Sequence, residues 1–210
     1  LLIGNDNDQD LAEQPGNQLA GYDLRWAFQS MPLALYGQFI GEDEANGLPS
    51  KFLGLMGAEV WGDSPLGQWR VHAEYAGTSC SFSRSPVEFG CAYEHSLYTQ
   101  GYRYRGRGIG HAMDGDGLMY SIGALLMRGA DQRWEVLLRE VELNRDADVT
   151  TQQHTISPLA AKLRNVEISH TRELGMGRVQ LGVGFDDYSL RLDGGGSSET
   201  RGFVQWSRAF

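Results

Sequence analysis

The sequence is short of lysine, cysteine and long apolar runs, and it has no initiator methionine. The longest apolar run extends from about Met31 to Tyr36, far short of the ~20 residues that a membrane-spanning helix needs. Such a chain either stays in water or crosses a bilayer as β-strands, the other structure that satisfies its backbone groups in lipid. No N-terminal segment joins a basic flank to an apolar centre, as a secretion signal would. We therefore expect a C-terminal or processed piece of a longer protein.

Positive charge is also scarce. Lys and Arg together number 18 against 27 Asp and Glu, which gives a net charge of -9. This balance disfavours nucleic acid as a partner, because the phosphate backbone is itself anionic. Only Lys51 and Lys162 are lysines, and the guanidinium of arginine suits bidentate recognition of carboxylates. The alternative explanation for the preference for arginine over lysine is a simple bias of composition.

Cys80 and Cys91 are the only cysteines. An even pair within one loop is compatible with a single disulfide, which a periplasmic or cell-surface location would permit, and two reduced thiols are the alternative. Together with His95 and His111 they do not have a zinc-ligand spacing, so we expect no metal. The sequence also shows no nucleophile elbow, phosphate loop or dinucleotide fingerprint, and we expect no cofactor.

Apolar and polar side chains alternate with a period of two along much of the chain, which is typical of β-strands. In the clearest case Tyr22, Leu24 and Trp26 share one face, while Asp23 and Arg25 share the other. Nine such segments have roughly the ten residues that a tilted barrel strand needs. They are 20–29, 33–42, 51–61, 67–76, 117–128, 132–143, 162–173, 178–192 and 199–210. Without an internal repeat or a linker, residues 1–210 are predicted to form one β-unit with no second domain.

The connections between these segments differ at the two ends of the expected sheet. If the strands alternate in direction, one end has short connections, at 30–32, 62–66, 129–131 and 174–177. The other end has mostly long ones, at 43–50, 77–116, 144–158 and 193–198. Outer-membrane barrels have short periplasmic turns and long external loops, whereas a soluble meander has no reason to separate them. The terminal strand ending on Phe210 fits the same class, with an ordinary closing strand of a soluble β-domain as the alternative.

All five tryptophans lie near a short connection or the C-terminus, as one aromatic girdle would require; they are Trp26, Trp61, Trp69, Trp134 and Trp206. The sequence therefore predicts an all-β, antiparallel outer-membrane β-barrel with a periplasmic C-terminus and the long loops outside. Nine strands is an odd number for a single-chain bacterial barrel, and an open sheet edge cannot face lipid. We expect this chain to be the C-terminal half of a larger barrel whose missing N-terminal part supplies further strands.

Short sequence motifs follow one another in a fixed order along the chain. They are Gly-Tyr-Asp-Leu-Arg-Trp at 21–26, Tyr-Gly-Gln-Phe-Ile-Gly-Glu-Asp-Glu at 36–44, Pro-Ser-Lys at 49–51, Gly-Ala-Glu-Val-Trp at 57–61, Glu-Tyr at 74–75, Tyr-Glu-His at 93–95, Gly-Tyr-Arg-Tyr-Arg-Gly-Arg at 101–107, Ile-Gly-His at 109–111 and Asp-Gly-Asp at 114–116. In this order they resemble the capsule assembly protein Wzi family, over most of the chain and most densely from 20 to 117.

The resemblance implies an outer-membrane barrel of eighteen strands with an N-terminal helical part, which this chain does not contain. Proteins of the family are lectin-like anchors of capsular polysaccharide at the surface of Gram-negative bacteria, and they are not enzymes. The implied partners are capsular polysaccharide, outer-membrane lipid and the missing N-terminal half of the same barrel. The resemblance brings no residue-level binding motif that could be transferred to this chain.

The long connection 77–116 is the main candidate for binding polysaccharide. Tyrosines can stack on sugar rings and arginines can pair with uronate carboxylates. The candidates are Tyr98, Tyr102, Arg103, Tyr104, Arg105 and Arg107. The alternative is plain strand alternation, with the tyrosines toward lipid and the arginines toward the lumen.

Other polar clusters have less specific interpretations. Glu42, Asp43 and Glu44 could bind a cation or sugar hydroxyls, although a solvated loop is the simpler explanation. Asp114 and Asp116 could form the carboxylate pair of a glycoside hydrolase or a calcium loop, and we favour a polar turn. Charged residues on inward faces are expected to form ion-pair ladders that fill the lumen; they are Asp23, Arg25, Arg70, Glu74, Arg133, Glu135, Arg178 and Asp186. A non-enzymatic capsule anchor is the leading hypothesis, with a porin and a β-glycanase as alternatives.

Overall fold

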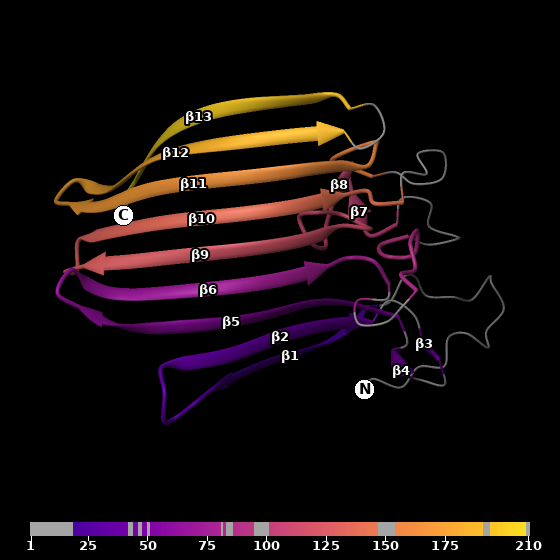
Figure 1. Ribbon diagram of the computed structural model, residues 1–210, viewed down its shortest axis with the longest axis horizontal. Helices are drawn as coiled ribbons and strands as arrows, with labels where there is room; N and C mark the ends of the chain where they lie inside the picture. Colours follow the sequence, from indigo (N-terminus) through magenta and orange to yellow (C-terminus); the bar gives the residue numbers. More distant parts are fainter. Residues whose placement is uncertain are drawn as a thin grey trace.

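The computed structural model describes residues 19–41, 44–45, 48–49, 51–80, 82, 86–94, 101–146, 154–190 and 194–208. In this part of the chain nine strands form one sheet in which every neighbouring pair is antiparallel (Figure 1). The strands follow one another in the order of the sequence. They are β1 (Ala20–Ala27), β2 (Leu33–Gly41), β5 (Phe52–Ser64), β6 (Gly67–Gly77), β9 (Leu118–Arg128), β10 (Gln132–Leu143), β11 (Ala161–Leu174), β12 (Gly177–Leu190) and β13 (Gly196–Ser207).

The prediction of an all-β antiparallel meander of nine strands is confirmed. Two short hairpins lie outside the sheet, β3 (Glu44–Ala45) with β4 (Leu48–Pro49) and β7 (Arg103–Tyr104) with β8 (Arg107–Gly108). The sheet is not closed, because β1 and β13 stand at opposite ends of its strand order. No helix in the described residues is long and apolar enough to cross a membrane.

The two ends of the sheet differ as the sequence predicts. The tight turns of β1–β2, β5–β6, β9–β10 and β11–β12 gather at one end, and the strand ends that lead into the longer connections lie at the other (Figure 1). We call these the turn end and the loop end. The β5–β6 turn is tighter than the predicted 62–66, because Ser64 pairs with Gly67 and leaves only Pro65 and Leu66 between the strands. The Ser64 hydroxyl stabilises it by accepting a bond from the Leu66 amide at 3.2 Å.

One face of the sheet, here called the inner face, is polar over most of its length. Arg25 on β1 donates to Glu59 on β5 at 2.9 Å, and Tyr36 on β2 donates to Glu74 on β6 at 2.7 Å. Each of these bonds passes over an intervening strand, so long polar side chains of the inner face link strands that are not neighbours. The same holds for Arg201 on β13, which reaches across β12 to Glu167 on β11. The predicted ladders of polar side chains therefore lie on the inner face.

The opposite, outer face carries an exposed apolar band. Its members come from every long strand, because the register places them opposite one another across the sheet. Trp26 is 63% exposed, Val183 47% and Val204 75%. A soluble sheet that leaves one face in water carries its polar residues on that face, so this arrangement is the one that a lipid-facing barrel wall requires. Trp61 is an exception to the predicted girdle, because it shares the inner face with Glu59.

The polarity of both faces reverses toward the loop end. On the outer face Glu140 pairs with Lys162 at 2.6 Å and with Arg164 at 3.0 Å. On the inner face the same strands bury Val141 and Leu143 against Met113 of the long connection. The apolar outer band therefore stops short of the loop end, where the sheet has a polar outside and a packed inside.

Two inner-face glycines allow aromatic rings to lie across the sheet. A Cβ at Gly57 would stand 2.3 Å from the Tyr36 ring, and one at Gly182 would stand 2.3 Å from the Phe203 ring. Each ring comes from the neighbouring strand and covers the glycine. Because Tyr36 lies flat over Gly57, its hydroxyl reaches Glu74 on the next strand.

Candidate functional site

The described residues of the connection between β6 and β9 are folded onto the inner face at the loop end. Its two ends are joined, because the Thr78 amide donates to the Gly117 carbonyl at 2.9 Å and the Gly117 amide donates to the Thr78 hydroxyl at 2.8 Å. Cys80 and Cys91 form a disulfide with a Cα–Cα distance of 5.9 Å. The segment therefore leaves and re-enters the sheet at one point.

Asp114 is the centre of a buried polar cluster that holds this connection. Its side chain accepts bonds from Arg103 at 2.8 and 3.0 Å, and from the amide and hydroxyl of Thr155 at 2.8 and 2.7 Å. Arg103 also pairs with Glu94 at 2.7 Å. We call Glu94, Arg103, Asp114 and Thr155 the Asp114 cluster. It ties the β6–β9 connection to the β10–β11 connection.

Burial and hydrogen bonding act in opposite directions on Asp114. Burial raises the pKa of its carboxyl, but the bonds from Arg103 and Thr155 outweigh this effect and hold the pKa below its ordinary value. The carboxylate is therefore charged and fully engaged at neutral pH. Asp116 is equally buried and accepts a bond from the Gly90 amide at 2.9 Å.

The two aspartates lie in tight backbone turns with positive φ, 61° at Asp114 and 54° at Asp116. A hydrolase pair needs one proton-donating carboxyl and one carboxylate that both face substrate, whereas these side chains are each 1% exposed. No group of three or more potential metal ligands occurs among the described residues. Both aspartates hold the loop fold together.

Of the predicted binding residues, those that the structure describes lie in three places. Tyr98 lies outside the described residues, as do Glu42, Asp43 and His95. The Arg103 guanidinium is buried in the Asp114 cluster, so it faces protein carboxylates and not solvent. Tyr104, Arg105 and Arg107 are exposed on the β7–β8 hairpin. Tyr102 lines a cavity beneath that hairpin.

The β7–β8 hairpin exposes its side chains to solvent because its turn is tight. Arg105 and Gly106 have φ values of 51° and 73°, the left-handed pair that two-residue hairpins favour. The turn directs Tyr104, Arg105 and Arg107 into solvent, and the Arg105 guanidinium lies 5.2 Å from the centre of the Tyr104 ring. An aromatic face with two guanidinium groups nearby can bind a sugar that carries a carboxylate.

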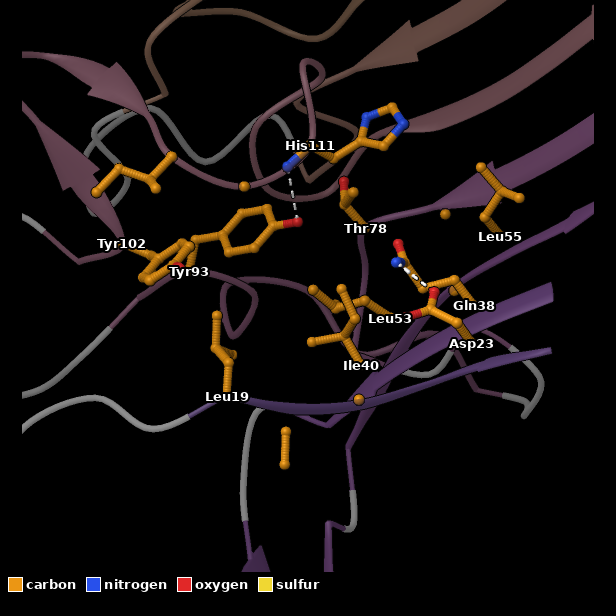
Figure 2. A pocket seen from close by; sticks show the side chains of 16 residues that line it. Leu19, Asp23, Gln38, Ile40, Leu53, Leu55, Thr78, Tyr93, Tyr102 and His111 are labelled. Atoms are coloured by element: carbon orange, nitrogen blue, oxygen red, sulfur yellow. Dashed lines mark hydrogen bonds between the residues drawn. The ribbon is translucent and has the colours of Figure 1, made fainter.

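A cavity of about 480 Å³ separates this connection from the inner face of β1, β2, β5 and β6. Figure 2 shows Tyr93 and Tyr102 on one side, with ring centres 6.0 Å apart. Asp23 and Gln38 lie on the other side, where the Gln38 amide donates to Asp23 at 2.7 Å. Sequence reasoning missed this cavity as a site, although alternation did place Asp23 on the inner face.

Comparisons with known proteins agree with this architecture. A family model described as "Capsule assembly protein Wzi" matches residues 1–199. The chain belongs to this family.

Two individual matches support the assignment. A Wzi structure from Escherichia coli superposes with a TM-score of 0.75 at 25% identity, covering 95% of this chain and 43% of that one. It is described as an outer membrane protein involved in group 1 capsule assembly and as a carbohydrate-binding β-barrel. An uncharacterized 55.8 kDa protein in the cps region of Klebsiella pneumoniae is 35% identical over 137 residues, 62% of this chain and 26% of that protein. The chain therefore spans less than half of either relative.

Two histidines of this Wzi-family chain are held in the neutral form. They lie in the described parts of the β6–β9 and β10–β11 connections, which are here called the loop-end fold. The His111 Nδ1 accepts a bond from the Met113 amide at 3.2 Å, and the His154 Nδ1 accepts one from the Ser157 amide at 3.0 Å. A protonated Nδ1 could not accept either bond. Burial lowers the pKa of both imidazoles, more than the nearby charges of Glu74 and Asp114 raise it.

We predict that acid loosens the loop-end fold before it affects the strands. A histidine whose folded pKa is lowered contributes stability above its unfolded pKa of about 6.5, and this stability is lost as the pH falls through the folded pKa. Hydrogen exchange, corrected for intrinsic rates, should show that protection of residues 101–117 and 154–160 falls as the pH is lowered below about 6.5. Exchange in β11 and β12 is the internal control, and His154→Asn should reduce the effect. Equal protection at pH 7 and pH 5 would contradict the prediction.

Proposed function

We propose that this chain is part of an outer-membrane barrel that holds capsular polysaccharide at the cell surface as a lectin-like, non-catalytic protein. The observation that carries the proposal is the exposed hairpin with Tyr104, Arg105 and Arg107, which projects from the wall of a cavity at the loop end of a Wzi-family sheet. Many capsules are acidic, and guanidinium groups beside an aromatic ring suit a uronate sugar.

The distribution of polarity supports an orientation with the loop end outside and the turn end in the periplasm. The outer apolar band would lie in lipid, and the charged outer face around Glu140, Lys162 and Arg164 would stand above it. The free edges of β1 and β13 would pair with strands from the rest of the protein, since lipid cannot satisfy an open edge. Residues 1–210 would then be one part of a single barrel unit.

The loop-end fold favours a role in holding polysaccharide, rather than a role as an enzyme or as an open pore. Asp114 and Asp116 are buried and bonded to protein groups, so neither is placed to protonate a glycosidic oxygen. The β6–β9 connection packs against the inner face through Met113, Tyr93 and the disulfide. It therefore covers this part of the lumen.

Binding of purified acidic capsular polysaccharides to the refolded full-length protein tests the proposal. We expect the parent to bind, and the double variant Arg105→Ala/Arg107→Ala to bind on the order of tenfold more weakly, with less dependence on salt. Arg178→Ala is the matched control, because it removes an exposed arginine at the turn end. Polysaccharide length should be the same before and after incubation. A parent that binds no polysaccharide, or that shortens it, would overturn the proposal.

A further inference from the structure

The cavity beneath the hairpin differs in charge from the hairpin itself. Among the described residues, its lining includes the carboxylate of Asp23 and no lysine or arginine. Burial lowers the pKa of His111, whose imidazole also lies in the described lining. A sugar carboxylate in this cavity would therefore meet like charge, with no cation among the described lining residues to compensate for it, which is costly at short range.

The same lining suits the hydroxyl groups and the C–H face of a neutral sugar. The Gln38 amide nitrogen uses Oδ1 of Asp23, which leaves Oδ2 of Asp23 and the carbonyl oxygen of Gln38 to accept bonds from sugar hydroxyls. The rings of Tyr93 and Tyr102 lie on the opposite side (Figure 2), where an apolar ring face can pack. A volume of about 480 Å³ lies within the range usual for small-ligand sites.

The cavity and the hairpin are adjacent along one short stretch of chain. Tyr102 directly precedes β7 and Ile109 directly follows β8, and the Ile109 amide donates to the Tyr102 carbonyl at 3.1 Å. Both residues line the cavity. The exposed Tyr104 is two residues from Tyr102, about 7 Å along an extended strand, so neighbouring residues of one polysaccharide can occupy both places.

We propose that the cavity is a subsite for a neutral pyranose residue, next to the hairpin that binds an acidic residue of the same polysaccharide. The inference rests on the proposed function and adds that neutral and acidic sugar residues bind in different parts of the site. Asp23 and Gln38 bind sugar hydroxyls, and Tyr102 packs against the sugar ring. Arg105 and Arg107 pair with the uronate outside.

Saturation-transfer NMR on the full-length protein can test the division with two sets of probes. The neutral probes are the methyl glycosides of glucose, galactose, mannose and N-acetylglucosamine, and the acidic probes are those of glucuronate and galacturonate. We expect at least one probe of each set to bind. Tyr102→Ala and Asp23→Asn should weaken the neutral probe fivefold or more and leave the acidic probe within twofold of the parent. Arg105→Ala/Arg107→Ala should have the reverse effect.

Controls separate loss of contact from loss of fold. Tyr102→Phe keeps the ring and should bind the neutral probe as the parent does, and protection of the β5 and β6 amides reports an intact sheet in every variant. The inference is overturned if a parent that binds capsular polysaccharide binds no neutral probe. It is also overturned if Tyr102→Ala and Asp23→Asn bind the neutral probe as the parent does. In both cases the proposed function stands, whereas a parent that binds no polysaccharide removes the function itself.

Discussion

Replacing Arg103 by alanine should destabilise the loop-end fold by about 3–5 kcal/mol, the cost of leaving a buried charge without its partner. Asp114 is 1% exposed and has Arg103 as its only cationic partner among the described residues. Its carboxylate would keep the Thr155 bonds but lose the two from the guanidinium. Opening free energies from hydrogen exchange of residues 101–117 would measure the effect.

The substitution tests whether Arg103 is a structural residue or a contact for polysaccharide. Arg107→Ala is the matched control, because it removes an exposed arginine from the same hairpin and should change the opening free energy by less than about 0.5 kcal/mol. The double variant Arg103→Met/Asp114→Leu should cost less than Arg103→Ala, because it removes both charges together. Equal protection in Arg103→Ala and Arg107→Ala would show that the Asp114 cluster does not hold the connection.

Replacing Val183 by arginine should cost about 2–4 kcal/mol of unfolding free energy in a phospholipid bilayer. Val183 lies in the outer apolar band of β12, opposite Ile168 on β11. An arginine there would place its charge in hydrocarbon or would have to extend to the interface. Denaturant titration of the refolded full-length barrel, followed by tryptophan fluorescence, would measure the change.

The same substitution near the loop end provides the control. Ser198 on β13 lies opposite Asp187 on the outer face, beyond the apolar band. An arginine there should cost about 0–1 kcal/mol, as expected near an interface. If Val183→Arg costs no more than Ser198→Arg, the outer band does not lie in lipid.

The strands could be predicted from sequence because alternation is a local property. Tyr22, Leu24 and Trp26 share one face whatever else the chain does, and nine such segments with unequal connections specify a meander with two different ends. The β5–β6 turn was placed less accurately, because the side-chain bonds of Ser64 that narrow it are not visible in a hydrophobic pattern.

The site was only partly predictable, because it depends on how the β6–β9 connection folds. Alternation would place Arg103, Arg105 and Arg107 on one face, but the left-handed turn at Arg105 separates them, and Asp114 buries the first. The cavity needs the β1–β2 register that pairs Asp23 with Gln38, together with the packing of Tyr93 against Leu53. Neither follows from residue spacing alone.

The attachment of capsule to living cells would show whether the β7–β8 hairpin holds the polysaccharide. In encapsulated cells that carry full-length Arg105→Ala/Arg107→Ala in place of the parent, the polysaccharide on the cells and in the medium would be measured separately. We expect the released fraction to rise several-fold, while total polysaccharide and the amount of barrel at the surface stay the same. An unchanged attached fraction, with the variant present at the parent's level, would contradict it.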